Sequence, residues 1–516
     1  MPLVYCGEKI VIMNYSQIEE YILNIPKFSV NSCFEETKKF YEFLGKPGTS
    51  ASIIHVAGTN GKGSTCAYMN SVLTEAGVKT GMFTSPHLVS VRERMRINNL
   101  LISEDEFVSV YLKLLEKIER YNQTLKENVI GETIALEKKH LEQKDGEMDE
   151  KIALEKKCLE EKEDKTAKTS EENSYENYVP TFYEVLFFMA MLYFEEQKTQ
   201  VIILETGLGG RLDATNVIDT PKVVVITEIG KDHMEYLGDN LEQIAEEKAG
   251  IIKAGTKVVY SRKRQDVTAV IERKIAQQGA LCKCVEKLEE AHYRFVDKMI
   301  DFSFFSRYYG YIPIILSTCA LYQIENARLA LSALEELEIE ISVTDMQNGM
   351  IKCKWEGRME EILPGVFLDG AHNEDGIAAF IATVKQDQCQ GKRWLLFSAV
   401  ADKEYVHMKE TLIASGLFGE IYAAPLNHVR RIDKERLEEI FSVDSVENGI
   451  RKENSTEHKI DYVFHDYKVR IVDKAWEGLE DIISLKKEED FVYVTGSLYL
   501  IGEIKERRNP NEKDMS

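Results

Sequence analysis

The sequence feature that most limits the fold of this chain is the glycine-rich segment HVAGTNGKGST at residues 55–65. A short apolar, β-branched run over 52–58 precedes the glycines and predicts a buried strand. Helical spacing follows over 63–77, and a second strand, broken by a proline, is expected over 78–87. A strand, a loop, a helix and a strand in this order form the setting that a phosphate-binding loop requires. The segment therefore predicts an α/β fold with a candidate nucleotide site.

The loop departs from the common phosphate-loop pattern G-x-x-x-x-G-K-[ST], because Gly63 separates Lys62 from Ser64. Its backbone N–H groups and the positive end of the following helix are still suited to a phosphate. Lys62 is expected to reach the outer phosphates as a point charge. A glycine-rich turn without a ligand is the alternative. The candidate phosphate-binding residues are Thr59, Asn60, Gly61, Lys62, Gly63 and Ser64.

Length, charge and cysteine content limit the classes of protein. The 516 residues fit two domains of ordinary size or three small ones. No apolar run of about 18 residues and no signal-type N-terminus is found, so neither a membrane span nor secretion is expected. Nine scattered cysteines without a framework favour free thiols in the cytoplasm. A net charge of −22 argues against a nucleic-acid partner but allows a local basic pocket for a small anion.

Strands and helices alternate along most of the chain, which predicts a mostly parallel sheet with helices on both faces. A second α/β series begins after WEGRMEEI, so we predict a domain boundary near residue 354, with a nucleotide-binding domain over 1–354 and a smaller Rossmann-like α/β domain over 355–516. Further strands are expected at 201–206, 223–230, 257–261, 365–370, 393–400, 420–426 and 491–496, further helices at 180–197 and 326–337, and a helix followed by a turn over 244–255.

A charged insertion interrupts this pattern over about 124–177. More than half of residues 131–173 are charged, and IALEKKHLE at 134–142 recurs as IALEKKCLE at 152–160. With only two copies, the repeat does not indicate a solenoid. A solvated helix or helical hairpin is one interpretation, and disorder is the other. Either way, the segment is expected to lie outside the catalytic fold.

Polar side chains are expected where strands end, which is where ligands sit in open parallel sheets. Two hard oxygen ligands and an imidazole are expected near the glycine loop, from Ser85, Glu205 and His233, and together they favour a Mg²⁺ site. Taken singly, Ser85 would be a turn residue and His233 a helix-start residue. Charge patterning alone predicts that Lys248 is a solvated helix lysine. Asp369 and His372 in DGAHN fit either a catalytic dyad or a solvated turn, and TGSLYLIGE offers a hydroxyl at the last strand end.

Taken together, these motifs resemble folylpolyglutamate synthase/dihydrofolate synthase, a branch of the Mur ligase superfamily. The resemblance is carried by HVAGTNGKGST, TSPHL, ETGLGGRLDATN, DHMEYLG followed by EKAGIIK, LDGAHN and TGSLYL, in this order. It covers nearly the whole chain apart from the insertion. The loop alone would indicate the superfamily, whereas ETGLGGRLDATN, DGAHN and TGSLYL point to the folate branch.

The resemblance implies a ligase that uses ATP and Mg²⁺ to add L-glutamate to a folate carboxylate through an acyl phosphate. Whether dihydropteroate is also a substrate stays open, because both reactions use the same ATP and metal groups. The resemblance assigns the glycine loop to the phosphates of ATP and assigns Ser85, Glu205 and His233 to Mg²⁺. It implies further ATP contacts from Asn326, Arg358 and Asp369, and contacts from His372 and Ser497 to the glutamate or the acyl phosphate.

Lys248 changes its interpretation under the resemblance, since the matching lysine in this family is carbamylated and becomes an anionic metal ligand. Two departures from the family pattern are Glu374 after DGAHN and Glu356 before a glycine, positions that often hold proline. A different Mur-type ligase and a non-catalytic nucleotide-binding protein are the alternatives. The resemblance also implies a cytoplasmic monomer whose domains close over the substrates.

Overall fold

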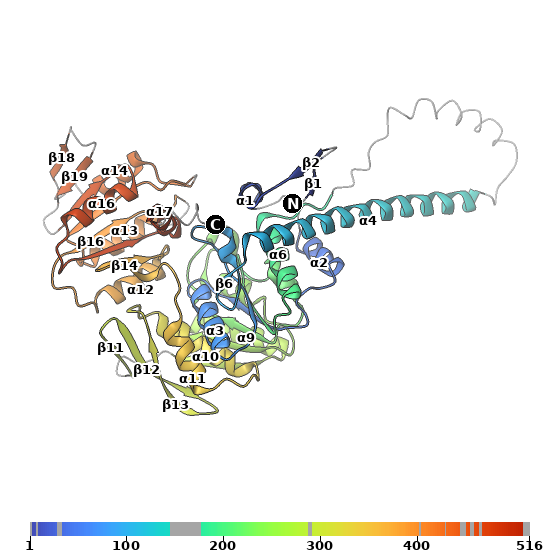
Figure 1. Cartoon of the computed structure of the whole chain (residues 1–516), viewed down its shortest axis with the longest axis horizontal. Helices are drawn as coiled ribbons and strands as arrows, with labels where there is room; N and C mark the ends of the chain where they lie inside the picture. The colour runs from blue at the N-terminus through green and yellow to red at the C-terminus, as the bar shows by residue number, and fades with distance from the viewer. Residues whose placement is uncertain are drawn as a thin grey trace. The chain divides into compact units, whose positions relative to one another are not determined.

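The chain forms two compact units, Met1–Pro47 with Asp105–Leu192 and Gly48–Glu104 with Tyr193–Ser516 (Figure 1). The structure is a computed structural model. The structure describes residues 3–6, 9–27, 33–144, 177–286, 292–401, 404–428, 430–443, 450–454, 459–463 and 467–508. Within these residues, no helix is both long and apolar enough to cross a membrane.

The first unit is mainly helical and is held together by aromatic side chains. The ring of Phe40 lies 4.8 Å from that of Tyr178 and 5.0 Å from that of Phe188, measured between centroids. Its elements are β1 (Leu3–Cys6), β2 (Lys9–Ile12), α1 (Tyr15–Leu23), α2 (Phe34–Phe43), α4 (Glu104–Lys144) and most of α6 (Phe182–Glu196). Helix α4 runs without a break into the charged insertion as far as Lys144, and residues 145–176 lie outside the described part.

The second unit contains an eight-stranded sheet that carries the glycine loop. The strand order is β10-β9-β8-β3-β7-β4-β5-β6. All pairs from β10 to β4 are parallel, and β5 and β6 add an antiparallel edge. The strands are β3 (Ser52–Ala57), β4 (Thr80–Phe83), β5 (Met95–Ile97), β6 (Leu100–Leu101), β7 (Val201–Glu205), β8 (Val223–Ile226), β9 (Lys257–Arg262) and β10 (Leu281–Glu286).

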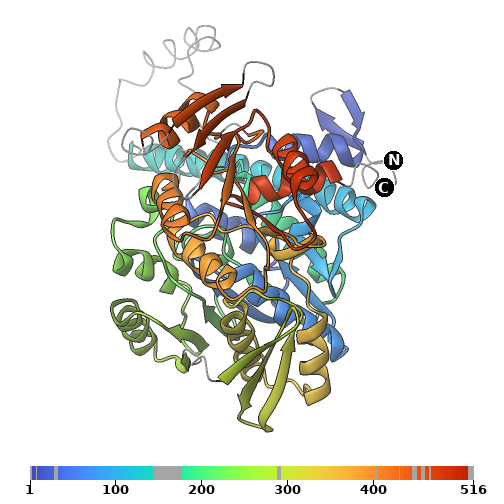
Figure 2. The same ribbon diagram turned by 90° about the vertical axis from the view of Figure 1, so that its left-hand side faces the viewer.

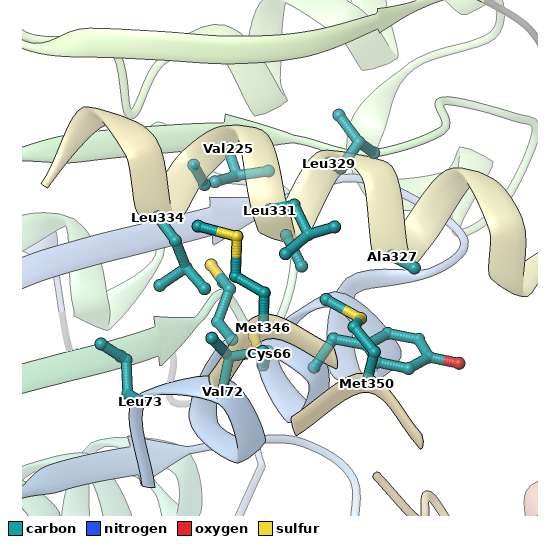
Figure 3. Packing of buried hydrophobic residues seen from close by; sticks show 14 of the residues in the cluster. Cys66, Val72, Leu73, Val225, Ala327, Leu329, Leu331, Leu334, Met346 and Met350 are labelled. Carbon is teal, nitrogen blue, oxygen red and sulfur yellow. The ribbon is translucent and has the colours of Figure 1, made fainter. Parts of the chain in front are cut away.

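Helices cover both faces of this sheet because its strands are apolar on both sides. In β8, Val225 belongs to the core beneath α3 (Lys62–Glu75), α10 (Gln323–Glu336) and α11 (Val343–Lys352), whose packed side chains Figure 3 shows. The next residue, Ile226, belongs to the opposite core with α8 (Leu241–Ala249) and α9 (Gln265–Gln278). Helices α3 and α11 approach so closely that a Cβ on Gly349 would stand 2.4 Å from the Cα of Val72.

A three-stranded antiparallel sheet that the sequence analysis did not predict extends the first core. Its strands are β11 (Tyr293–Val296), β12 (Met299–Ser306) and β13 (Gly310–Leu316). Alternate residues such as Phe302, Phe304 and Ile314 are buried in the core shared with α10 and α11.

A second eight-stranded sheet follows, in the order β14-β15-β21-β16-β17-β20-β19-β18. Its centre, from β15 to β20, is parallel and its edges are antiparallel. Figure 2 shows these strands in orange and red with helices beside them. The strands are β14 (Arg358–Leu363), β15 (Val366–Asp369), β16 (Arg393–Phe397), β17 (Glu420–Ala423), β18 (Ile450–Asn454), β19 (Lys459–Val463), β20 (Lys468–Ile471) and β21 (Phe491–Thr495).

Side chains of β16 alternate between two cores, with Leu395 in one and Leu396 in the other. The covering helices are α12 (Glu374–Val384), α13 (Tyr405–Ala414), α14 (Lys434–Val443), α16 (Ala475–Leu485) and α17 (Leu498–Arg508). The predicted fold class, a mostly parallel α/β sheet followed by a smaller α/β part, is confirmed. The predicted division at residue 354 remains a prediction.

Candidate functional site

The glycine loop between β3 and α3 is a cradle that only glycine allows at two positions. Gly58 has φ +150°, and a Cβ there would stand 1.9 Å from the Oγ1 of Thr227. Gly61 has φ +87°, and its Cβ would stand 2.2 Å from the Oδ1 of Asn326. Side chains at these positions would clash and would require a backbone conformation that L-residues avoid. The loop therefore leaves its backbone open for the close approach of a ligand.

Hydrogen bonds to the loop after β8 fix this cradle. The backbone N–H groups of Thr59 and Asn60 donate to the carbonyl oxygen of Glu228, over 2.7 and 3.2 Å. The Thr59 hydroxyl donates to the Gly230 carbonyl over 3.0 Å. Lys62 folds back over the loop, where its Nζ donates to the carbonyl oxygens of Gly58 and Thr59 over 3.1 and 3.2 Å. The ammonium group is thus held at the loop itself.

Helix α10 supports the start of α3 through a chain of amides. Asn326 Nδ2 donates to Gln323 Oε1 over 3.0 Å, and Gln323 Nε2 donates to the hydroxyl of Ser64 over 3.2 Å. All three side chains are buried. Asn326, a predicted ATP contact, therefore lies against the glycine loop.

The predicted metal ligands Ser85 and Glu205 come together at neighbouring strand ends. Ser85 N–H donates to Glu205 Oε2 over 3.1 Å. Burial raises the pKa of Glu205, while Lys62, the Ser85 N–H and Arg358 favour its charged form. A buried carboxylate beside a phosphate cradle is a suitable ligand for a hard cation.

His233, the third predicted metal ligand, is partly exposed at the start of a short helix. It has φ +51° at the start of α7 (Met234–Leu237), and its Nε2 lies 3.9 Å from Asp232 Oδ1. Its side chain is 39% exposed. Across the described ranges, no three His, Cys, Asp or Glu side chains gather into a metal-binding cluster. Any cation here would take its remaining ligands from phosphate oxygens and water.

The loop after β7 is ordered around Asp213. Its Oδ2 accepts hydrogen bonds from the N–H groups of Gly207 and Leu208, each over 2.8 Å. Its Oδ1 accepts from the hydroxyl of Thr215 over 2.5 Å, and that hydroxyl lies 2.8 Å from the Nε2 of the buried His55. This chain of hydrogen bonds ties the loop that follows Glu205 to β3.

Lys248 extends from α8 to the same cradle. Its side chain is buried, and its Nζ donates to the Gly58 carbonyl over 2.8 Å. A Cβ on Gly210 would stand 2.9 Å from the Lys248 carbonyl, so a glycine is required for α8 to come this close. The solvated lysine that charge patterning alone predicts is therefore wrong.

Arg358 and Asp369 face each other as register partners across β14 and β15. Asp369 is buried, and its Oδ2 accepts from the Tyr322 hydroxyl over 2.5 Å and from the Met359 N–H over 3.0 Å. Burial raises the pKa of Asp369, and Arg358 opposes that rise. Asp369 therefore does not lie in a solvated turn.

The DGAHN loop after β15 contacts the glycine loop and the loop after β8. Asn373 and Asn60 exchange amide hydrogen bonds of 3.1 and 3.3 Å. His372 Nδ1 lies 2.8 Å from the Gly370 carbonyl, and its Nε2 lies 3.5 Å from Asp232 Oδ2. His372 is thus oriented by a backbone carbonyl and by a carboxylate in the loop after β8, whereas Asp369 accepts from Tyr322 and is not its dyad partner.

Ser497 lies in the next loop of the same sheet edge. Its side chain is buried, and its hydroxyl accepts from the Tyr499 N–H over 3.2 Å. The preceding residue, Gly496, donates its N–H to the Ala371 carbonyl over 3.0 Å. The loops that carry His372 and Ser497 are therefore joined, as β15 and β21 are neighbours.

Sequence reasoning missed five residues of this region. They are Tyr322, Gln323, Asp232, Asn373 and Trp355, whose indole lies 3.0 Å from the position of a Cβ on Gly63. Three of them, Asp232, Asn373 and Trp355, lay inside segments that had already been singled out, DHMEYLG, DGAHN and WEGRMEEI. A polar residue next to a candidate ligand was the available signal.

The glycine cradle, Lys62, Lys248 and the buried carboxylate of Glu205 lie at one end of the first sheet, and the DGAHN loop of the second sheet contacts this cradle. Residues 151–334 match the Mur ligase middle domain, so this part of the chain is similar to the Mur ligases.

The full chain narrows this class. It is 30% identical over 511 residues to the dihydrofolate synthase/folylpolyglutamate synthase of Bacillus subtilis, covering 96% of this chain and 99% of the relative. The chain belongs to the folylpolyglutamate synthase/dihydrofolate synthase family, as the sequence motifs predict.

Solved structures show the same fold. E. coli FolC in complex with DHPP and ADP matches with a TM-score of 0.72 at 22% identity, covering 97% of this chain and 99% of that one. The folylpolyglutamate synthase of Thermotoga maritima matches with a TM-score of 0.68 at 25% identity, covering 95% and 96%.

Proposed function

We propose that this protein is an ATP-dependent ligase that adds L-glutamate to the carboxylate of a folate or folylpolyglutamate. The observation that carries the proposal is the 30% identity to a dihydrofolate synthase/folylpolyglutamate synthase across 96% of the chain. The site supports it, because a phosphate cradle and a second polar sheet edge are joined through Asn60 and Asn373.

The chemistry needs two displacements. A carboxylate oxygen of the folate attacks the γ-phosphorus of ATP, and ADP leaves. The amine of glutamate then attacks the acyl carbon, loses a proton, and expels inorganic phosphate as the amide forms. The main difficulty is to bring several anions together, so cations and N–H donors carry the catalysis.

The first-sheet residues are assigned to ATP and its metal. We expect the loop from Thr59 to Ser64 to surround the phosphates, with Lys62 on the outer ones. Ser85, Glu205 and His233 would hold Mg²⁺, which supplies positive charge to the phosphates when bound. Carbamylation of Lys248, already buried beside Gly58, would add an anionic ligand.

The remaining contacts are assigned as the sequence motifs predict. We expect ATP contacts from Asn326 beside the cradle and from Arg358 and Asp369 at the first strands after residue 354, the proposed domain boundary. His372 and Ser497 would contact the glutamate or the acyl phosphate. Use of dihydropteroate, a monomeric state and a cytoplasmic location stay predictions.

The test is release of ADP by the purified full chain. We expect release only when ATP, Mg²⁺, a reduced folate and L-glutamate are all present. Release that does not depend on a folate or pteroate would contradict the substrate assignment. Complementation of a strain without dihydrofolate synthase then decides whether dihydropteroate is also used.

Two lysine variants test whether Lys62 takes part in catalysis. Lys62→Ala should lower kcat at least about 100-fold, because it removes a charge from the phosphate cradle. The matched control is Lys352→Ala, since Lys352 is 60% exposed and pairs with Glu75 on the surface. Equal activity of the two variants would refute the role of Lys62.

A further inference from the structure

One cluster of polar and aromatic side chains in the second sheet has no role in the assignments above. Arg430 lies in the loop after β17, and its Nη2 donates to the hydroxyl of Tyr499 over 2.7 Å. Its guanidinium carbon lies 5.3 Å from the centroid of the Tyr499 ring. The ring of His428 stacks on that of Tyr499, with centroids 4.0 Å apart and planes 27° apart.

The loop that carries this cluster is fixed from two sides. The Arg430 carbonyl accepts from the Ala401 N–H over 2.8 Å, which joins it to the loop after β16. The Asn427 N–H donates to Glu503 Oε2 over 3.2 Å, which joins it to α17. A guanidinium so held keeps its planar fork of donors in one orientation, and a carboxylate is the group that such a fork binds in a bidentate manner.

His428 adds a second donor of fixed orientation. Its Nδ1 accepts a hydrogen bond from the Arg430 N–H over 3.1 Å. A neutral ring that accepts at Nδ1 carries its proton on Nε2. Both polar side chains are partly exposed, so a small ligand has access to them.

The cluster adjoins the site already described. Tyr499 is two residues after Ser497 and donates its N–H to the hydroxyl of that residue over 3.2 Å. The carboxyl ends of the parallel strands β15, β21, β16 and β17 line one edge in this order, and ligands bind at such edges. His372 follows β15 and lies next to Asp232 in the loop after β8, whereas Arg430 follows β17, three strands further along.

We propose that Arg430, supported by Tyr499 and His428, binds the side-chain carboxylate of the incoming glutamate. This inference rests on the proposed function. The amine of that glutamate must face the acyl carbon, which lies toward the glycine loop and His372. The α-carboxylate shares a carbon with the amine and must stay near it. The side-chain carboxylate lies two methylene groups beyond that carbon and extends along the sheet edge toward β17.

The test compares two neighbouring arginines in the full chain. Arg430→Gln removes the proposed carboxylate ligand. Arg431→Gln removes the same charge from an exposed side chain that pairs with Asp433 over 3.1 Å. KM is measured for L-glutamate, ATP and folate, with thermal midpoints as a check on folding.

Arg430→Gln should raise the KM for glutamate about 10- to 100-fold, the effect of losing a charged hydrogen-bonded pair. The KM values for ATP and folate should stay within about threefold, and Arg431→Gln should resemble the wild type. The ratio of kcat/KM for glutamate to that for glutamine should fall about as far, because only glutamate carries the charge that Arg430 recognises.

Three outcomes would overturn the inference. One is an unchanged KM for glutamate in Arg430→Gln. Another is equal loss in both arginine variants. The third is an unchanged ratio of glutamate to glutamine, which would place Arg430 on the α-carboxylate or in a structural role. If the wild type does not turn over with folate and glutamate at all, the proposed function fails first, and this is seen before any variant is compared.

Discussion

Replacing Gly61 with alanine tests whether the shape of the glycine loop governs nucleotide binding. The φ of +87° costs a non-glycine residue about 1–2 kcal/mol. The new Cβ would also stand 2.2 Å from Asn326 Oδ1, so that side chain has to move. Its hydrogen bond to Gln323 is then lost, at about 1 kcal/mol. The local cost sums to about 2–3 kcal/mol.

This strain acts at the point where the phosphates of ATP are expected. It should therefore weaken the binding of ATP and also lower the stability of the fold. We expect the KM for ATP to rise at least about tenfold, which corresponds to about 1.4 kcal/mol. Gly77→Ala is the matched control, since Gly77 has φ +72° at the other end of α3 and open space around its Cβ position. It should lower the thermal midpoint and leave the KM for ATP within about twofold.

A double variant identifies the clash itself. Asn326→Ala removes the atom that the new Cβ would meet. Gly61→Ala should therefore raise the KM for ATP by a smaller factor in the Asn326→Ala background than in the wild type. Additive losses would show that the clash is not the cause. A wild-type KM for ATP in Gly61→Ala, or an equal rise in Gly77→Ala, would refute the reasoning about the cradle.

Three further predictions concern protonation and packing around the loop. Burial raises the pKa of Glu205, so protons compete with Mg²⁺ for this carboxylate. The apparent KM for Mg²⁺ should therefore fall as the pH rises through that pKa. A Glu205→Gln variant with the same pH profile as the wild type would contradict this prediction. Burial lowers the pKa of His55 from 6.5 to about 3, so the unfolded state binds the proton first as the pH falls. The free energy of unfolding, measured in urea, should therefore fall as the pH drops from 6.5 toward 3, and less steeply in His55→Gln. Equal slopes against pH in the wild type and the variant would contradict this prediction. Trp355 lies against Gly63, so ATP should change the tryptophan fluorescence of the wild type but not that of Trp355→Phe, and an unchanged response in the variant would assign the signal elsewhere.

Strands and their polar ends are predictable from the sequence because they depend on local patterning. The apolar run before Gly58 and the run before Thr206 both form parallel strands of one sheet, β3 and β7. Glu205 ends β7 and Ser85 lies just after the neighbouring strand β4, so the rule that ligands collect at one sheet edge brings them together correctly. Local patterning was sufficient for these elements.

Contacts between distant loops were not predictable in the same way. Asn373 meets Asn60 across 313 residues, and this pairing depends on how the second sheet is oriented against the first. Arg358 meets Asp369 because β14 is an antiparallel edge strand, a register that no single-strand pattern contains. Charge patterning failed at Lys248 because a helix that packs on a glycine turn buries a lysine which periodicity alone places in solvent.

The cation content of the site shows why net charge is a poor guide to local chemistry. The chain carries −22 overall, yet Lys62 and Lys248 both donate to the carbonyl oxygen of Gly58, over 3.1 and 2.8 Å. Two ammonium groups on one acceptor repel each other, and burial weakens the screening of that repulsion. An anion at the cradle lowers this energy, and so does conversion of Lys248 into a carbamate, which replaces the repulsion by attraction. The same arrangement therefore favours both a polyphosphate ligand and the proposed modification, because each supplies negative charge where the partly buried Lys62 and the buried Lys248 meet.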